Sequence, residues 1–370
     1  MERGIDVVDL FVAGHNWAPT YRIPSLAVAP DGTLLAFCEC RRDSRRDDAP
    51  KDILLKRSED SGRSWSETHM AVPGPGLDGI NNPCPLVEGD SIYLFCINRQ
   101  KQGVRCHQHL MARSDDNGKT WSDATDIGER FRDYDPTFVP GPGVCVRMRN
   151  GRWVVPGNAR GPAFFEKADA EKEDGVPFSR VAFSDDQGDT WALGEAVDCP
   201  ASNESQAVEL SDGALILNFR IQDGAKGCRG MAVSTDGGES WRETFMLPQI
   251  QDPVCQGGFI RCDVQETAET ADCLLLSNLD APPKSKGGGR WNLTVWLSFD
   301  GGRTWPAKRS VHPGPAAYSC PAVLPDGTIG LLYECGDEDR YERIRFAKFD
   351  FDYITDGGSD ETGSPRRPLI

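Results

Sequence analysis

The stretch SEDSGRSW, residues 58–65, is the first of five copies of one short pattern, Ser-x-Asp-x-Gly-x-Ser/Thr-Trp. The other copies occupy residues 114–121, 184–191, 234–241 and 298–305, and an apolar, strand-like run precedes each copy. Asp and Gly favour a tight turn, the hydroxyl groups can hydrogen-bond its backbone, and the Trp can pack back on a sheet. The sequence therefore predicts a repeated strand-and-turn unit with variable connecting loops.

A second series of segments, each a strand, a turn and a strand, alternates with these boxes. There are six such hairpins against five boxes, at residues 28–37, 86–95, 147–156, 209–219, 269–278 and 323–334. Residues 5–14 form one further strand before the first unit, and the last unit continues through residues 343–353 without a box. A ring of six small sheets, the last completed by the N-terminal strand, accounts both for the extra strand and for the last unit without a box. We predict an all-β, six-bladed β-propeller of four-stranded antiparallel blades over residues 1–355, with a disordered tail over 356–370.

Composition is consistent with a soluble, turn-rich protein. The chain has 370 residues, 39 of them glycine and 26 proline, and its formal net charge is −16, which argues against nucleic acid or an anionic membrane as partner. No apolar stretch is long enough to span a bilayer, and the first residues lack the pattern of a signal peptide. Thirteen cysteines without a Cys-x-x-Cys pair favour free thiols. We expect a cytoplasmic protein, monomeric or weakly oligomeric.

Two sequence features could in principle hold a metal. The Asp-rich boxes resemble fragments of calcium loops but lack the bidentate Glu and the alternating ligands of such loops. The pair His107 and His109 could begin a metal site, but no further His and no obvious carboxylate partner completes it. We therefore expect no metal and no cofactor.

The phase of the repeat predicts where a site would form. Arg22, Glu204 and Tyr318 each precede the aspartate of a hairpin turn by eight or nine residues, in the first, fourth and last units. In a propeller, the innermost strands of the blades begin near the central axis, so these side chains should meet on one face. Arg220, at the end of a strand, and Arg290, at the start of one, are candidates for the same place.

Three arginines in one place point to an anionic ligand. Their planar guanidinium groups suit a carboxylate, and an anion between them offsets their mutual repulsion. The alternative is that they are unrelated surface residues with local ion pairs. Candidates for the surrounding wall are Asn82, Arg99, Gln256 and Arg261.

The sequence resembles a known family, the exo-α-sialidases (neuraminidases) of the bacterial and animal type, which carry Asp-box, or BNR, repeats. The resemblance covers nearly the whole chain and includes YRIP at residues 21–24, NESQAVELSDGALILNFR at 203–220, GGRWNLTVWLSFDGGRTW at 288–305 and AYSCPAVLPDGTIGLLYE at 317–334. Boxes also occur in non-catalytic propellers, whereas the ordered set of Arg, Glu, Arg, Arg and Tyr is far more specific.

The resemblance implies a role for each of these residues. It implies that Arg22, Arg220 and Arg290 bind the carboxylate of sialic acid and that Glu334 braces Arg22. It also implies that Tyr318 is the nucleophile, with Glu204 as its general base, in a retaining hydrolysis of terminal sialic acid from glycans, glycoproteins or glycolipids.

A physical argument favours tyrosine over a carboxylate as nucleophile. Two unit charges about 4 Å apart at an effective dielectric constant of about 20 repel by about 4 kcal/mol, so a carboxylate is disfavoured beside the anionic sugar. A neutral tyrosine avoids this repulsion but needs a neighbouring base to take its proton. Glu204 has the matching phase, whereas Glu209 is interpreted as a structural charge within a strand.

The acid/base is expected in the charged stretch CRRDSRRDDAP, residues 40–50, which follows the second strand of the first unit. The family pattern of an arginine followed about six residues later by an aspartate fits Arg41 and Asp47, and Asp48 stays open as the alternative. An exposed loop suits a group that protonates a leaving sugar and then activates water. Other functions left open are a non-catalytic propeller that binds glycan or protein, a trans-sialidase, and a hydrolase of deaminated sialic acid.

Overall fold

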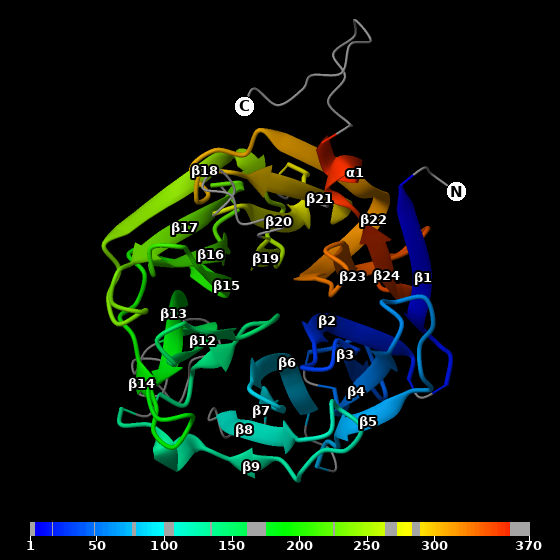
Figure 1. The fold of residues 1–370 in the computed structure, drawn as a ribbon, viewed down its shortest axis with the longest axis horizontal. Helices are drawn as coiled ribbons and strands as arrows, with labels where there is room; N and C mark the ends of the chain where they lie inside the picture. The colour runs from blue at the N-terminus through cyan, green and yellow to red at the C-terminus, as the bar shows by residue number, and fades with distance from the viewer. Residues whose placement is uncertain are drawn as a thin grey trace, which may run out of the picture.

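The computed structural model describes residues 4–16, 18–47, 49–75, 79–99, 107–133, 135–160, 175–224, 226–262, 272–282 and 289–355. Within these ranges the regular structure is β-strand, apart from a 3-10 turn η1 (Gly128–Arg130) and a short helix α1 (Phe351–Thr355). The strands form successive antiparallel groups arranged around a central axis (Figure 1). The predicted all-β fold is confirmed.

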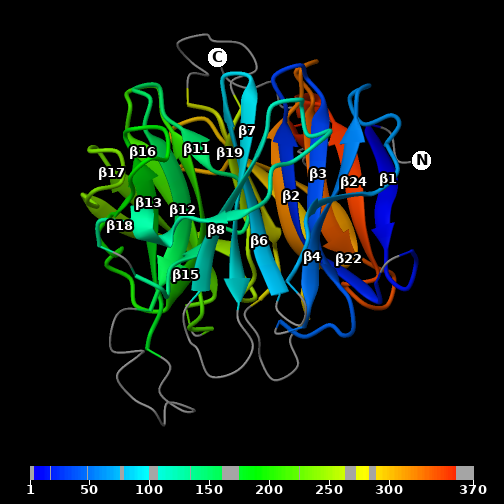
Figure 2. The ribbon, with the colours of Figure 1, turned by 90° about the horizontal axis from the view of Figure 1, so that it is seen from below.

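The first two groups share one sheet. Its strands are β2 (Thr20–Val28), β3 (Leu34–Arg41), β4 (Lys51–Ser58), β5 (His69–Val72), β6 (Gly79–Glu88), β7 (Ser91–Arg99), β8 (His107–Ser114) and β9 (Thr125–Asp126). Among the described residues, one parallel pairing, between Lys51 and Gly79, joins the two groups. Figure 2 shows strands β2 to β4 beside β6 to β8.

The next two groups are separate sheets. One contains β10 (Val139–Pro140), β11 (Val146–Arg147), β12 (Trp153–Ala159), β13 (Phe178–Ser184) and β14 (Ala192–Leu193). The other contains β15 (Ser202–Glu209), β16 (Leu215–Ile221), β17 (Cys228–Ser234) and β18 (Glu243–Gln251). Two short strands, β10 and β11, replace a single inner strand in the first of these sheets, so its pattern departs from four regular strands.

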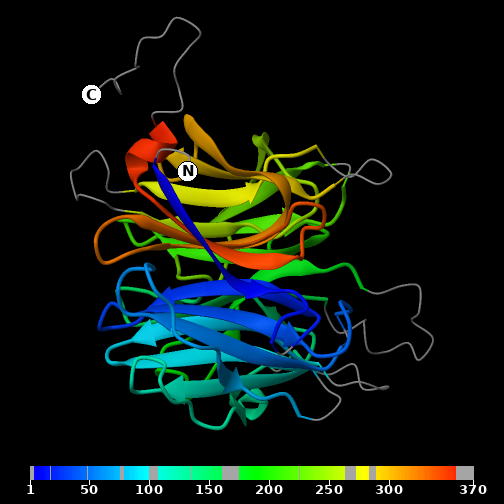
Figure 3. The ribbon, with the colours of Figure 1, turned by 90° about the vertical axis from the view of Figure 1, so that its right-hand side faces the viewer.

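The remaining strands form one sheet in the order β1-β24-β23-β22-β21-β20-β19. Their bounds are β19 (Gly258–Arg261), β20 (Leu274–Leu279), β21 (Trp291–Ser298), β22 (Ala307–Val323), β23 (Ile329–Cys335), β24 (Arg343–Phe349) and β1 (Ile5–Val12). The long strand β22 pairs with β21 through its first half and with β23 through its second half. The N-terminal strand β1 pairs antiparallel with β24 (Figure 1), and it is the dark blue strand that faces the viewer in Figure 3. The chain turns into helix α1 after β24, where the sequence pattern had continued as strand.

The core lies between neighbouring groups of strands. In β3, Leu34, Ala36 and Cys38 pack with the last group, whereas Leu35 and Phe37 pack with the second group. Alternate side chains of a strand point to opposite faces, so both faces of β3 are buried. This explains why the strand reads as a nearly continuous apolar run.

Each box is a turn closed by its own side chains. In the first box, Asp60 Oδ1 accepts from Ser58 Oγ and from the backbone N–H of Ser64, both at 2.8 Å, and Asp60 Oδ2 accepts from Ser64 Oγ. The backbone N–H of Gly62, a residue with φ of 87°, donates to Ser58 Oγ. These bonds lower the pKa of Asp60 to about 2. Both oxygens of the Asp60 carboxylate thus accept hydrogen bonds within the turn rather than binding an ion.

The boxes also join neighbouring groups. The Trp65 ring of the first box lies 5.1 Å from the ring of Phe346 in β24, and the Trp121 ring of the second lies 5.7 Å from Phe37 in β3. A Cβ on Gly62 would lie 2.3 Å from Phe346, so only glycine fits there. The first box therefore packs the first group against the last.

Innermost strands are interrupted by bulges at one end of the molecule. The register shifts between Arg22 and Ser25 in β2, between Ser202 and Ser205 in β15, and between Ala316 and Ser319 in β22. A bulge re-aims the side chains beside it. It is at these bulges that Arg22, Glu204 and Tyr318 lie.

Three further predictions concern the cysteines, membrane-spanning segments and the C-terminal tail. The cysteines in the described ranges are free, and Cys145 is the one among them that is not fully buried. No helix in these ranges is long and apolar enough to cross a membrane. The predicted tail over residues 356–370 lies outside the described residues.

Candidate active site

Tyr318 is the centre of a buried polar cluster. Its hydroxyl donates to Glu204 Oε1 at 2.5 Å and accepts from Arg220 Nη1 at 3.2 Å. The guanidinium carbons of Arg22 and Arg290 lie 5.3 and 5.5 Å from the centre of its ring. The structure thus brings together five residues from three sheets, with Arg290 just before strand β21.

Arg22 is fixed by Glu334, which is fully buried in β23. Glu334 Oε1 accepts from Arg22 Nε at 2.7 Å and from the backbone N–H of Ile23 at 2.8 Å. Its other oxygen accepts from the backbone N–H of Tyr318 at 3.1 Å. One carboxylate therefore sets the relative position of Arg22 and Tyr318. Burial by itself would lower the pKa of Arg22, but the charge of Glu334, together with Tyr341 and Tyr318, outweighs burial and raises that pKa above its usual value.

The other two arginines have different partners. Arg220 Nε donates to Asn203 Oδ1 at 2.9 Å, and its Nη1 lies 2.6 Å from Glu204 Oε2. Arg290 donates to the hydroxyl of Tyr341 and to the carbonyl of Val254, at 3.2 and 3.0 Å. The alternative of three unrelated surface arginines is wrong, because all three surround Tyr318.

Electrostatics keep Tyr318 protonated. Burial, followed by the nearby Glu204 carboxylate, raises the pKa of Tyr318 well above its usual value, and the charges of Arg220 and Arg290 oppose this only in part. A phenol in this state is a poor nucleophile until its proton is removed. The 2.5 Å contact makes Glu204 the group placed to accept that proton.

Asp47 lies on the loop after β3 and its side chain is 75% exposed. Its Oδ1 lies 2.9 Å from Arg41 Nη1, which also donates to the carbonyl of Arg45. Partial burial would raise the pKa of Asp47, but the charges of Arg41, Arg22 and Lys51 outweigh it and lower that pKa. Asp48 lies outside the described residues.

A buried network supports this loop. Glu39 Oε2 accepts two hydrogen bonds from Arg41, at 3.1 and 3.0 Å, and Glu39 Oε1 accepts from the backbone N–H of Asn82. Lys51, which is fully buried, donates to the backbone carbonyl of Asp47 at 2.7 Å. The loop that carries Asp47 is therefore anchored at its base from two neighbouring strands.

Sequence reasoning missed several of these residues. Glu39 is two positions before Arg41, so strand alternation could have placed it on the same face. Nothing in the repeat phase singles out Tyr341, whose ring lies 3.8 Å from the guanidinium carbon of Arg22. Glu209, as predicted, makes a structural ion pair, with Arg149.

The proposed wall residues have mixed positions. Asn82 lies beside Glu39, and Gln256 is buried, with its side chain bonded to the backbone of Ser319. Arg261 instead donates to the carbonyl of Glu209. The side chain of Arg99 is outside the described residues.

Metal ligation finds no support in the described ranges. No group of three or more His, Cys, Asp or Glu residues there is arranged to hold an ion. His109 is buried, and its Nε2 lies 2.9 Å from the carbonyl of Phe138. The side chain of His107 is not among those described.

Comparison with known proteins identifies the family. Residues 32–332 match the model of the BNR repeat-like domain. A sialidase from Micromonospora viridifaciens is 35% identical over 92% of this chain and 53% of its own length. The chain thus spans about half the length of that relative.

Solved structures of known proteins superimpose on this chain over most of its length. Hadza microbial sialidase Hz136 superimposes with a TM-score of 0.81 and 27% identity, over 94% of this chain and 69% of that one. The intramolecular trans-sialidase from Ruminococcus gnavus superimposes with a TM-score of 0.72 over 94% of this chain and 98% of that one, and its 21% identity shows the fold alone.

The chain belongs to the BNR repeat-like family, within an all-β fold that sialidases share. The resemblance to BNR-repeat sialidases predicted from the sequence is confirmed.

Proposed function

We propose that the protein is a retaining exo-α-sialidase, which hydrolyses terminal α-linked sialic acid of glycoconjugates through a covalent tyrosyl intermediate. We further propose that the strand groups are the six blades of one propeller, closed by β1. The observation that carries the function is the 2.5 Å contact between the Tyr318 hydroxyl and Glu204 among three arginines. A glycan-binding propeller has no need of a buried phenol paired with a base.

The first half of the proposed reaction uses three sets of groups: the arginines, the pair of Tyr318 and Glu204, and Asp47. Arg22, Arg220 and Arg290 bind the substrate carboxylate and orient the anomeric carbon. Tyr318 Oη attacks that carbon as its proton passes to Glu204. The bond to the leaving sugar breaks with its electron pair on the glycosidic oxygen, which takes a proton from Asp47.

The second half reverses the roles. Asp47, now ionised, removes a proton from water, whose oxygen forms the new bond to the anomeric carbon. The bond to Tyr318 breaks, and the phenolate recovers its proton from Glu204. Two inversions at one carbon give net retention.

A related activity on the same site is the second candidate. The fold is shared with an intramolecular trans-sialidase, in which the acceptor belongs to the substrate itself. Both reactions use one intermediate and differ in the acceptor that reaches it.

Release of a fluorogenic aryl sialoside tests the function. We expect turnover by the wild-type chain, and a loss of about a thousandfold or more in Tyr318→Phe, which keeps the ring but lacks the attacking oxygen. Binding of an unsaturated sialic acid analogue by Tyr318→Phe confirms that the site is intact. Near-normal turnover by this variant contradicts the mechanism, and binding without turnover by the wild type favours a non-catalytic propeller.

A further inference from the structure

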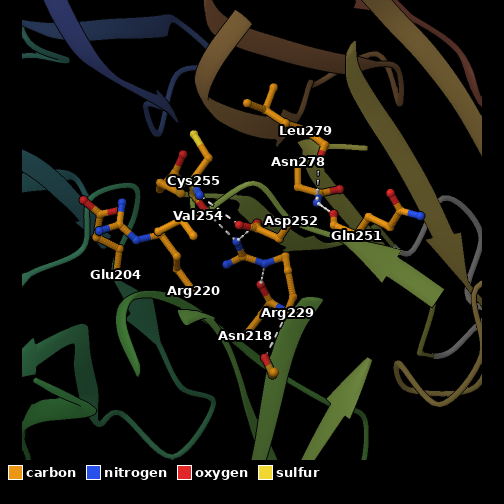
Figure 4. A network of polar contacts seen from close by, with 12 residues as sticks. Glu204, Asn218, Arg220, Arg229, Gln251, Asp252, Val254, Cys255, Asn278 and Leu279 are labelled. Atoms are coloured by element: carbon orange, nitrogen blue, oxygen red, sulfur yellow. Dashed lines mark hydrogen bonds and ion pairs between the residues drawn. The ribbon is translucent and has the colours of Figure 1, made fainter. Parts of the chain in front are cut away.

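A short segment, Asp252–Gln256, which is buried except for the partly exposed Val254, lies between strand β18 and the candidate active site (Figure 4). It presents the carbonyl of Val254 to Arg290 Nη2 at 3.0 Å. At its end, Gln256 Oε1 accepts from the backbone N–H of Ser319, the residue after Tyr318. The segment thus contacts both an arginine of the site and the strand of the nucleophile.

The conformation of this segment is intrinsically unfavourable. Val254 has φ of 63°, in the left-handed region, where a β-branched side chain is strongly disfavoured. Such a backbone persists only where surrounding contacts hold it. The contacts that hold it are therefore part of how Arg290 is placed.

Those contacts come from one buried ion pair. Arg229 and Asp252 are both almost fully buried, and Arg229 Nη1 lies 2.9 Å from Asp252 Oδ2. The same nitrogen donates to the carbonyl of Cys255 at 2.9 Å, and Asp252 Oδ1 accepts from the backbone N–H of Cys255 at 2.8 Å. The pair therefore holds the peptide groups on the C-terminal side of Val254.

Other residues also fix the position of Arg229, the cation of the pair. Arg229 Nε donates to Asn218 Oδ1 at 2.6 Å, on the neighbouring strand β16 (Figure 4). A Cβ on Gly257 would lie 3.0 Å from Arg229 Cζ, so the backbone after Gln256 packs closely on the guanidinium group. Arg220 extends from the same strand as Asn218 into the active site.

We propose that Arg229 and Asp252 are positioning residues, which hold Val254 in its unfavourable conformation so that its carbonyl orients Arg290 for the substrate carboxylate. The inference rests on the proposed function, since it assigns Arg290 to carboxylate binding. Neither residue touches the substrate. The pair acts on recognition of the carboxylate through the backbone of one turn.

The experiment compares two ligands that differ at C1, where one carries a charged carboxylate and the other a neutral ester. One is an unsaturated sialic acid analogue, and the other is its C1 methyl ester. In Asp252→Asn and in Arg229→Lys, we expect the preference for the acid over the ester to fall about tenfold or more, as it does when one oriented charged contact is lost. The affinity for the ester changes little.

A control and a rescue separate positioning from stability. Arg152, which pairs with Asp185 away from the site, supplies the control, because Asp185→Asn also breaks an ion pair of a mostly buried arginine. We expect Asp185→Asn to keep the preference for the acid. Glycine adopts a positive φ freely, so Val254→Gly in the Asp252→Asn background should restore part of the preference.

The outcomes are distinct. An unchanged preference in folded Asp252→Asn and Arg229→Lys overturns the inference, as does an equal loss in Asp185→Asn. Absence of both turnover and binding in the wild type overturns the proposed function instead.

Discussion

The hydroxyl of Tyr318 and the carboxylate of Glu204 form a 2.5 Å hydrogen bond, although the two residues are 114 positions apart in the chain. The other oxygen of Glu204 lies 2.6 Å from Arg220. The carboxylate is thus held in place by a cation while it faces the phenolic proton. In the proposed mechanism, this pairing gives a neutral nucleophile a base whose negative charge is paired with Arg220.

Glu204→Gln should lower kcat by about a hundredfold to ten-thousandfold near neutral pH, the range expected for loss of a general base. Because the pKa of Tyr318 is raised well above its usual value, its ionised fraction is minute at neutral pH and rises tenfold with each pH unit. With an activated aryl sialoside, whose leaving group needs no proton from Asp47, the residual activity of Glu204→Gln should therefore increase with pH. A pH–rate profile measures this, and a flat profile contradicts the role of base.

Asp47→Ala should affect substrates according to their leaving groups. Natural glycosides need a proton on the departing oxygen, whereas activated aryl sialosides do not. We expect a loss of about a hundredfold or more with a sialyllactose and a much smaller loss with an aryl sialoside. If Asp48→Ala gives this pattern and Asp47→Ala does not, the acid/base is Asp48.

The charge of Arg41 should determine the pH above which Asp47 can no longer protonate the leaving sugar. Arg41, with Arg22 and Lys51, lowers the pKa of Asp47, so its protonated fraction in the free enzyme falls as pH rises above that lowered value. We expect kcat/KM for sialyllactose to be highest at acidic pH. A profile that rises through neutral pH contradicts this assignment.

Glu334→Gln should destabilise the fold as well as the site. Glu334 is fully buried and is the ion-pair partner of Arg22, so the substitution leaves a buried cation without its counter-charge, at a cost of about 3–5 kcal/mol. Urea unfolding measures it. Glu243→Gln is the matched control, because its ion pair with Arg303 is exposed and its loss should cause little change.

The box aspartates should make stability depend on pH. Asp60 has a pKa of about 2 in the folded chain against 3.8 ordinarily, so it stabilises the fold fully above 3.8 and loses this contribution as pH falls toward 2. We expect Asp60→Ala to unfold more readily than the wild type at pH 7, by about 1 kcal/mol. The difference should shrink below pH 4, and a constant difference contradicts the role of the charge.

Much of the fold could be predicted from the sequence because its signals are local. A box such as residues 58–65 closes on itself, and the hairpin turns carry the Asp and Gly that such turns require. The similar spacing of eight or nine residues before hairpin turns even indicated that Arg22, Glu204 and Tyr318 belong together. The short strands β10 and β11 and helix α1 lack such a signal, since tertiary packing decides them.

The supporting residues of the site were harder to predict for the same reason. Tyr341 lies in an irregular loop, and its place against Arg22 depends on how the last strand group meets the first. The role proposed for Val254 depends on its positive φ, and a valine in a sequence gives no indication of such a backbone conformation. Contacts across groups, unlike turns, have no local pattern.

The central claim is that Tyr318 forms a covalent bond with the sugar. Incubation with a 3-fluorinated sialosyl fluoride, followed by proteolysis and mass spectrometry, tests this directly, because the fluorine slows breakdown of the intermediate. The account predicts one sialosyl adduct on the peptide that contains Tyr318, absent in Tyr318→Phe. An adduct on Glu204 or Asp47, or turnover of this reagent with no adduct on Tyr318, would contradict it.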